Sequence, residues 1–208
     1  QPIQYAAKDL ELTHEKTKFT VEIDGRDLHI EVPIPGYFTV YNAMAAVVAC
    51  HAAEIDSYCI EHGLKQMKPV AGRFEPLDTH GRDFSIILDY AHTPDSLKNA
   101  LDTAKSFAPA RVVTIFGCGG NRDSSKRAIM GKIAGERADF TVITSDNPRF
   151  EEPGAIIAQI EEGMKQTGGE YVCIENRRDA IEYAIRNAKK DDVILLAGKG
   201  HEDYQEIK

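Results

Sequence analysis

Short apolar segments alternate with helical patterns over the second half of the chain. The segments span residues 84–90, 111–117, 139–145, 171–176 and 192–198, and the helical patterns between them span residues 94–107, 125–137, 153–166 and 177–190. Continuous apolar strands that alternate with helices are typical of a parallel sheet covered on both faces. The alternation therefore predicts an α/β fold with a mostly parallel sheet and helices on both faces.

The residues before this alternation follow a different pattern. Two strands of alternating polarity flank Asp24 and Gly25, a dipeptide that favours a type I′ hairpin turn. Helices are expected over about 42–53 and 57–67, and Asp56 is the expected N-cap of the second. The first part of the chain is thus predicted to be a hairpin followed by helices.

Residues 68–74, KPVAGRF, are interpreted as a linker between the two parts. We predict one domain over residues 1–70 and a second over residues 71–208. The chain begins in the middle of a pattern, without Met, and stops abruptly at residues 205–208 (QEIK), so we expect a fragment of a longer protein.

Charge and hydropathy exclude some classes of partner. The formal net charge of −8 and the pI near 5.4 argue against non-specific binding to nucleic acid or to an anionic membrane. No stretch approaches the roughly 18 apolar residues of a membrane span, and the N-terminus lacks a signal-peptide layout. We predict a cytoplasmic, monomeric protein that binds small molecules and neither nucleic acid nor membrane.

The four cysteines show no C-x-x-C spacing and lie mostly within apolar runs: Cys50, Cys59, Cys118 and Cys173. This pattern predicts buried free thiols in a reducing compartment and disfavours a zinc site. We assign no metal ligand within the chain.

Charged or glycine-rich motifs follow four of the five predicted strands. They are DYAHTPD (89–95), GCGGNRDSSKR (117–127), SDNPR (145–149) and GKGHE (198–202). In open α/β sheets, ligands bind outside the carboxyl ends of the strands. A ligand site is therefore expected where these motifs meet.

The glycine-rich motif supports two interpretations. Its exposed amides before a helix suit an anion or a nucleotide, but they also suit a plain strand-to-helix turn. Lys126 and Arg127 could meet phosphates or form a solvated first turn. Because cations oppose the helix dipole at that end, the phosphate interpretation is favoured. The motif is not G-x-G-x-x-G followed by the usual acidic residue, so support for a dinucleotide site is weak.

The motif after the first strand is partly explained by helix capping. Thr93 is an expected N-cap, and Pro94 suits the first helical position. Capping leaves Asp89 and His92 unexplained. An acidic residue at a strand end is well placed to bind ribose hydroxyls, and we give Asp89 that role.

The SDNPR motif places a single arginine just past a strand. Pro148 lacks a backbone donor and restricts Asn147, so it should hold Arg149 in a fixed direction. The planar guanidinium matches a carboxylate bidentately. The alternative is a local ion pair with Glu151 or Glu152. In GKGHE, the glycines permit close approach of a ligand, although an ordinary loop with solvated charges is equally compatible.

Six motifs, in order, resemble the Mur ligase family, and within it the ligases that add meso-diaminopimelate. They are YNAMAA (41–46), GRFE (72–75), DYAHTPDSL (89–97), FGCGGNRDSSKR (116–127), SDNPRFEEP (145–153) and AGKGHEDYQ (197–205). The resemblance implies the end of a central ATP-binding domain over residues 1–70 and a Rossmann-like, amino-acid-binding C-terminal domain over residues 71–208. It also implies ATP-dependent amide bond formation through an acyl phosphate, with UDP-muramoyl dipeptide, meso-diaminopimelate and ATP as substrates.

The resemblance also implies residue roles. The nucleotide-binding set is Asn42 (adenine), Arg73 (phosphates), Asp89 (ribose), His92 and Lys126. The diaminopimelate-binding set is Arg122, Asp146, Asn147, Pro148, Arg149, Gly198 and Glu202. The sequence departs from the family at Thr39, where a second asparagine is usual.

No residue of the chain is assigned to catalysis. G-x-x-x-x-G-K-[ST], the phosphate cradle that ATP-driven ligation requires, does not occur in the sequence. We expect the cradle, the Mg²⁺ ligands, the modified lysine and the UDP-binding domain upstream of Gln1, and a further segment beyond Lys208. The fragment is therefore expected to be inactive alone.

Two other interpretations stay open. One is a related amide ligase: a lysine-adding enzyme, a folylpolyglutamate synthase or a cyanophycin synthetase. The other is a non-catalytic nucleotide-binding module. DNPR discriminates against the lysine-adding enzymes, which lack the arginine.

Overall fold

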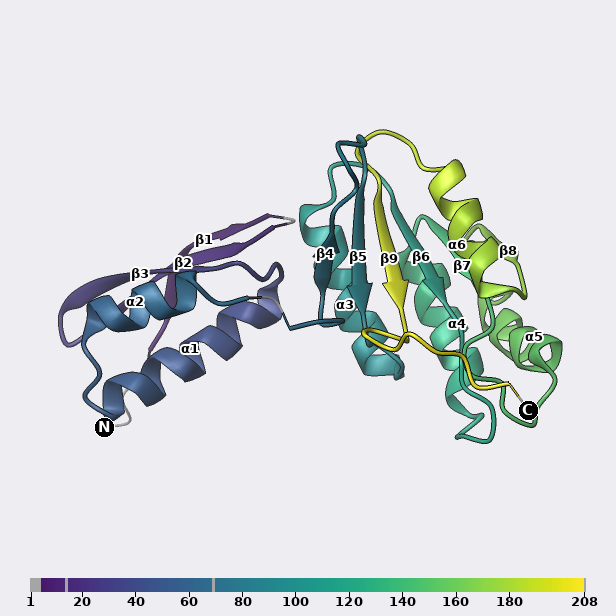
Figure 1. Cartoon of the computed structure of the whole chain (residues 1–208), viewed down its shortest axis with the longest axis horizontal. Helices are drawn as coiled ribbons and strands as arrows, with labels where there is room; N and C mark the ends of the chain where they lie inside the picture. Colours follow the sequence, from purple (N-terminus) through teal and green to yellow (C-terminus); the bar gives the residue numbers. More distant parts are fainter. Residues whose placement is uncertain (1–4, 14, 69, 208) are drawn as a thin grey trace. The chain divides into compact units, whose positions relative to one another are not determined.

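The computed structural model describes residues 5–13, 15–68 and 70–207. The chain divides into two compact units, Gln1–Pro69 and Val70–Lys208. Pro69 of the expected linker lies outside the described residues, as do Gln1 and Lys208. Figure 1 shows the helices and strands of each unit.

The first unit is an antiparallel sheet packed against two helices. Its elements are β1 (Ala7–Leu12), β2 (Thr17–Ile23), β3 (Arg26–Val32), α1 (Tyr37–Ala52) and α2 (Ser57–Lys65), and the strand order is β1-β2-β3. Asp24 and Gly25 join β2 to β3 with φ of 49° and 75°, as a type I′ turn requires. Asp56 accepts a hydrogen bond from the Tyr58 N–H at 2.9 Å. The hairpin and this N-cap are confirmed.

Two elements of the first unit differ from the sequence prediction. β1 was not predicted, because its residues are mostly exposed and lack an apolar alternation. α1 begins at Tyr37, five residues before the predicted start at Asn42. Its first turns contain aromatic and β-branched residues typical of strands. Burial of Val40, Ala43 and Val47 against the sheet holds them in a helix.

The second unit contains a six-stranded sheet in the order β4-β5-β9-β6-β7-β8. The strands are β4 (Glu75–Leu77), β5 (Ser85–Asp89), β6 (Val112–Phe116), β7 (Phe140–Ile143), β8 (Tyr171–Cys173) and β9 (Val193–Ala197). All neighbours pair in parallel except β4, which is antiparallel to β5. The predicted mostly parallel sheet is confirmed. β4 was missed because it has three residues and contains Pro76, which is tolerated at a sheet edge.

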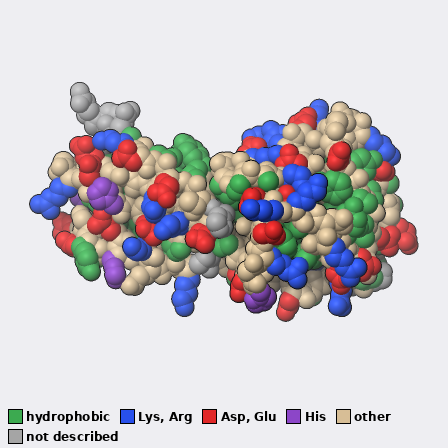
Figure 2. Space-filling view, turned by 90° about the horizontal axis from the view of Figure 1, so that it is seen from above, with side chains coloured by type: hydrophobic (Ala, Val, Ile, Leu, Met, Phe, Trp, Pro, Cys, Tyr) green, Lys and Arg blue, Asp and Glu red, His purple; other side chains and the backbone are tan. Residues whose placement is uncertain are grey.

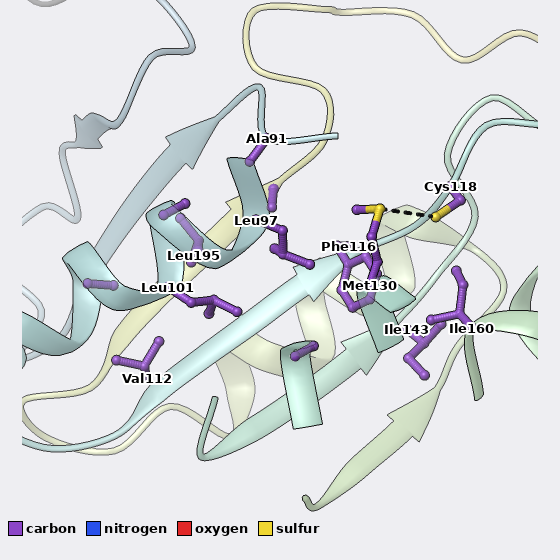
Figure 3. Packing of buried hydrophobic residues seen from close by; sticks show 14 of the residues in the cluster. Ala91, Leu97, Leu101, Val112, Phe116, Cys118, Met130, Ile143, Ile160 and Leu195 are labelled. Carbon is purple, nitrogen blue, oxygen red and sulfur yellow. Dashed lines mark hydrogen bonds between the residues drawn. The ribbon is translucent and has the colours of Figure 1, made fainter. Parts of the chain in front are cut away.

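Helices cover both faces of this sheet, as predicted. They are α3 (Pro94–Phe107), α4 (Lys126–Arg137), α5 (Pro153–Met164) and α6 (Arg177–Arg186). Side chains of α3, α4 and α5 pack with one set of strand residues, including Phe116 and Leu195 (Figure 3). Side chains of α6 pack with the alternate set, including Ile115 and Ile194. This alternation follows from the period of two along a strand.

The cysteine prediction is correct only in part. All four thiols are free, and Cys118 is buried with its Sγ 3.8 Å from the sulfur of Met130 (Figure 3). Cys59 on α2 and Cys173 at the end of the edge strand β8 are exposed, so the expectation of burial is wrong for both. An apolar run does not show which side of a helix or of an edge strand faces solvent.

Lys and Arg side chains are intermixed with Asp and Glu on the visible face of both units (Figure 2). Within residues 5–13, 15–68 and 70–207, no helix combines the length and the apolar character that crossing a membrane requires.

Candidate functional site

A cavity of about 440 Å³ lies beyond the carboxyl ends of β5, β6, β7 and β9. It is lined by Tyr90, His92, Thr93, Gly117, Cys118, Gly119, Arg122, Asp123, Lys126, Asp146, Asn147, Arg149, Gly198 and Glu202. These residues come from the four loops that the sequence pattern singled out. A cavity therefore lies at the edge of the sheet where a ligand site is expected.

Most of the residues implied by the resemblance line this cavity. The lining includes Arg122, Asp146, Asn147, Arg149, Gly198, Glu202, His92 and Lys126. Four do not line it. Pro148 is buried next to it, and Arg73 and Asp89 lie in the same unit. Asn42 lies on α1 in the first unit, where it is exposed.

The guanidinium of Arg149 is held by several acceptors. Its Nε lies 2.9 Å from Glu206 Oε2, and its Nη1 donates to the carbonyls of Gly120 at 2.9 Å and Asn147 at 3.4 Å. A local ion pair with Glu151 or Glu152 was the alternative prediction. The structure contradicts it, because the carboxylate partner of Arg149 comes from the far end of the chain.

The glycine-rich loop and the SDNPR loop lie in direct contact. Gly120 N–H donates to the Asn147 carbonyl at 2.8 Å. A Cβ added to Gly120 would lie 1.9 Å from the carbonyl oxygen of Pro148, so only glycine fits there. A Cβ added to Gly119 would lie 3.0 Å from Arg149 Nη1 and 3.7 Å from Arg122 Cγ. The two arginines therefore flank the same stretch of backbone.

Arg127 is not a solvated residue, so that interpretation is wrong, and its side chain does not line the cavity. The side chain is buried, and its Nη1 and Nη2 donate to the two carboxylate oxygens of Glu151 at 2.8 and 3.0 Å. Glu151 also accepts from the Asn121 N–H at 2.5 Å. The bond to Arg127, followed by that to Asn121, lowers the pKa of Glu151 to about 2. The pair joins α4 to both loops.

Glu202 carries a carboxylate that is oriented from several sides. Its Oε1 accepts from Tyr90 Oη at 3.2 Å, and its Oε2 lies 3.3 Å from Asn147 Nδ2 and 3.4 Å from Lys199 Nζ. Burial opposes ionisation, but Lys199 and these hydrogen bonds outweigh it, so the pKa of Glu202 is below its usual value. Glu202 is an anion at neutral pH.

Asp89 does not point an unused carboxylate into the cavity. Its Oδ2 accepts from the Phe74 N–H and its Oδ1 from the Ala91 N–H, both at 2.8 Å. Burial raises the pKa of Asp89, and the two backbone donors oppose that shift only in part. Within the chain, Asp89 therefore fixes Phe74, the last residue of the expected linker. A ribose contact stays a prediction.

Tyr90 connects the nucleotide-binding set to the amino-acid-binding set. The Arg73 guanidinium lies 4.7 Å from the centre of the Tyr90 ring, and the His92 ring lies 4.8 Å away edge-on. His92 also accepts a hydrogen bond at its carbonyl from Lys126 Nζ at 2.7 Å. The two cations of the predicted nucleotide set, Arg73 and Lys126, thus contact Tyr90 and His92, which line the cavity.

Sequence reasoning gave no role to three residues that shape this site: Tyr90, Lys199 and Glu206. Tyr90 stands beside Asp89 at a strand end, and this position was a usable signal. Lys199 is buried and donates to Asn147 Oδ1 at 2.9 Å, a contact between positions 52 residues apart. The same kind of long-range contact brings Glu206 to Arg149, and no local pattern could reveal it.

The cavity presents both signs of charge. Arg122, Arg149 and Lys126 supply cations, and Asp123, Asp146 and Glu202 supply carboxylates. A ligand that carries a carboxylate and an ammonium group could meet a partner for each. Within the described residues, no group of three or more His, Cys, Asp and Glu side chains is placed to hold a metal ion.

Comparison with known families and proteins gives consistent matches. Residues 72–200 match "Mur ligase, glutamate ligase domain", and residues 2–50 match "Mur ligase middle domain". A curated relative from Caldanaerobacter subterraneus subsp. tengcongensis is 50% identical over 201 residues, which cover 97% of this chain. A relative from Alkaliphilus oremlandii is 47% identical over 203 residues, again 97% of this chain. Both are named UDP-N-acetylmuramoyl-L-alanyl-D-glutamate–2,6-diaminopimelate ligase, and this chain spans 41% of each.

Solved structures agree. A UDP-N-acetylmuramoyl-L-alanyl-D-glutamate–2,6-diaminopimelate ligase structure aligns with TM-score 0.72 and 34% identity, covering 98% of this chain and 41% of that one. A folylpolyglutamate synthase from Thermotoga maritima aligns with TM-score 0.70 and 20% identity over 93% of this chain and 43% of that one, which indicates a shared fold alone.

Proposed function

Because the chain belongs to the Mur ligase family, we propose that it is the amino-acid-binding part of an ATP-dependent ligase that adds meso-diaminopimelate to UDP-N-acetylmuramoyl-L-Ala-D-Glu. Residues 71–208 form its C-terminal domain, and residues 1–70 are the end of its central ATP-binding domain. In this reaction ATP converts the peptide carboxylate to an acyl phosphate. The amine of diaminopimelate then attacks the acyl carbon, and phosphate leaves.

The observation that carries the proposal is that Arg149 and Glu202, a cation and a carboxylate, both line one cavity. Meso-diaminopimelate differs from lysine at its distal end, which bears a carboxylate as well as an amine. Arg149, with Arg122 beside the same backbone, provides cations for that carboxylate. The ionised Glu202, together with the Gly198 carbonyl, provides acceptors for the ammonium.

Charge pairing explains how such a site would reject lysine. Lysine lacks the distal carboxylate that Arg149 would bind in addition to Glu206, and losing one partner of a buried hydrogen-bonded charge pair costs about 2–5 kcal/mol. Sites built around a polar partner reject an analogue that lacks it by on the order of 10⁴-fold. Glutamate lacks the distal ammonium and would leave Glu202 without its substrate partner.

Two residues of the proposed nucleotide-binding set, His92 and Lys126, line the same cavity. We propose that Arg73 and Lys126 meet phosphates, with Asn42, Asp89 and His92 completing the ATP contacts. Mg²⁺ would neutralise phosphate charge during transfer, and none of the described residues is assigned to it. The reaction places the enzyme in the cytoplasm, where its nucleotide substrates are made.

The test uses the full-length ligase that contains this chain. Wild type and Arg149→Ala are offered meso-diaminopimelate, lysine and glutamate in turn, and mass spectrometry identifies the amino acid added to the UDP-muramoyl dipeptide. We expect wild type to add meso-diaminopimelate. We expect Arg149→Ala to lose about 10²-fold or more in kcat/KM for it, because 2–5 kcal/mol of pairing is removed, while the KM for ATP changes little.

Arg178→Ala is the matched control, since Arg178 is an exposed arginine that pairs with Glu182 on α6. It should leave the reaction unchanged. Near-normal diaminopimelate addition by Arg149→Ala would refute the assigned role, and addition of another amino acid by wild type would refute the proposed substrate.

A further inference from the structure

Residues 204–207 lie along the loop that carries Arg149. The Arg149 N–H donates to the Glu206 carbonyl at 3.2 Å, and Arg149 forms a parallel bridge with Ile207. The Gln205 side-chain amide donates to the Asp146 carbonyl at 2.6 Å. The end of the described chain is therefore attached to the SDNPR loop along its length.

Glu206 contacts Arg149 through both backbone and side chain. Its carbonyl accepts from the Arg149 N–H, and its carboxylate lies 2.9 Å from Arg149 Nε. Arg149 has φ of 55°, in the left-handed region that few residues other than glycine adopt. Such a conformation persists only when the surrounding structure holds it. Glu206 therefore helps to hold the backbone conformation of Arg149, the residue whose direction matters most for substrate binding.

The backbone of Glu206 is linked through Asn147 to a buried cation, Lys199. The Glu206 N–H donates to Asn147 Oδ1 at 2.8 Å, and Lys199 Nζ donates to the same oxygen at 2.9 Å. Lys199 also donates to the Tyr204 carbonyl at 2.8 Å. Hydrogen bonds thus link the buried Lys199 through Asn147 and Glu206 to Arg149.

We propose that Glu206 is a positioning residue for amino-acid selection: it holds Arg149 in the direction that receives the distal carboxylate of the substrate. Arg149 lines the cavity and Glu206 does not, so Glu206 acts from behind the guanidinium. Gly120 holds the opposite edge through Nη1. The inference rests on the proposed function, because it assumes that Arg149 meets a substrate carboxylate.

In the alternative role, the Glu206 carboxylate competes with the substrate carboxylate for Arg149 and must move away before the substrate binds. The two roles predict changes of opposite sign in the KM for the amino acid when the Glu206 carboxylate is removed. Loss of a positioning residue raises the KM for the amino acid, whereas loss of a competitor lowers it.

The test compares Glu206→Ala and Glu206→Gln with wild type in the full-length ligase. We expect Glu206→Ala to raise the KM for meso-diaminopimelate by about tenfold to hundredfold, since a displacement of about 1 Å can have effects of that size. The KM for ATP and the Tm should change little. Gln keeps an acceptor for the Arg149 Nε–H, so Glu206→Gln should show a smaller rise. An unchanged or lowered KM in Glu206→Ala would overturn the proposal.

Glu182→Ala is the matched control, because Glu182 also pairs with arginines, Arg178 and Arg186, but on the exposed surface of α6. It should leave both KM values unchanged. In an Arg149→Ala background, Glu206→Ala should add no further effect. A full additional effect there would show that Glu206 acts without Arg149 and would overturn the proposal.

Failure of the proposed function would look different. If wild type adds another amino acid, the substrate assignment fails, and the same comparison is made with the amino acid that it adds. The NMR signal of the Arg149 Nε–H, assigned by its loss in Arg149→Lys, gives a readout independent of activity. It should shift and exchange faster with solvent in Glu206→Ala, and an unchanged signal would overturn the inference.

Discussion

At the scale of single residues, the site depends on close contact between the backbone of the glycine-rich loop and the backbone of the SDNPR loop. Gly120 lies so close to the Pro148 carbonyl that a Cβ would overlap it at 1.9 Å. The φ of Gly120 is not positive, so the constraint is steric and not conformational. Pro148 itself is buried, and its rigid ring gives the loop little freedom to retreat. The distance between the two loops is therefore set by the absence of one methyl group.

Gly120→Ala should destabilise the second unit by about 1–3 kcal/mol, the usual effect of overpacking a well-packed site. The measurement is the free energy of unfolding from urea denaturation. Gly168→Ala is the control, since a Cβ there meets nothing within 4 Å. Equal effects of the two substitutions would contradict the steric argument.

At the scale of elements, the ion pair between Arg127 and Glu151 fixes how the glycine-rich loop and the SDNPR loop sit above α4 and α5. Arg127 also donates to Gln159 on α5 at 2.8 Å and to the Gly119 carbonyl at 3.2 Å. One buried guanidinium thus holds a helix, a second helix and a loop. This arrangement also sets the positions of Arg122 and Arg149, the two arginines that flank Gly119.

The Glu151 pair should make stability depend on acidity. The pKa of Glu151 is about 2 in the folded chain and about 4.3 in an unfolded chain. A lowered folded pKa contributes stability that is present above pH 4.3 and lost as pH falls towards 2. We expect the difference in urea midpoint between wild type and Glu151→Gln to be constant near neutral pH and to shrink between about pH 4.3 and pH 2.

Glu152→Gln is the matched control, because Glu152 is an exposed neighbour. Its effect on the midpoint should be small at every pH. A difference between wild type and Glu151→Gln that stays constant down to pH 2 would contradict the role given to this pair.

The sequence was informative about elements whose burial follows a regular period. The strands from β5 to β9 and the helices from α3 to α6 were predicted because their apolar patterns are continuous and their caps, such as Thr93 and Pro94, are explicit. The predicted start of α1 was too late, because the residues of its first turns are typical of a strand. Only their packing against the sheet shows that they are helical. β1 and β4 carry little apolar signal of their own.

The residues of the site also fall into those that the sequence could reveal and those that it could not. Residues at strand ends, such as Arg149 and Glu202, could be found because the topology brings strand ends together. The burial of Arg127 and the pairing of Glu206 with Arg149 could not be found. Both depend on contacts between residues 24 or more positions apart, which no local period encodes.

At the scale of the whole molecule, each unit has its own core. Phe19 and Val21 belong to the core of the first unit, and Phe116 and Leu195 to a core of the second. Cys59 is exposed in the first unit, whereas Cys118 is buried in the second. Burial raises the pKa of Cys118 to about 12. The two thiols therefore differ in access to solvent, and the buried Cys118 thiol is also hard to ionise.

Alkylation with iodoacetamide at pH 8 should label Cys59 in the folded protein and leave Cys118 unlabelled until urea unfolds the second unit. The physical reason is that the thiolate is the reactive form, and a buried thiol with a high pKa forms almost none. Mass spectrometry of peptides measures the extent at each site. Labelling of Cys118 at the rate of Cys59 would contradict its burial.

The position of β9 has a consequence for how the protein is made. Among the described residues β9 follows the other strands in sequence, yet it lies between β5 and β6 and pairs with both. A chain leaving the ribosome presents its N-terminal residues first. Until Val193–Ala197 emerge, the nascent sheet has a gap at its centre, with unpaired strand edges that invite association with other chains. Gly198 and Glu202 follow directly, so one continuous stretch of chain completes this sheet and contributes to the lining of the cavity.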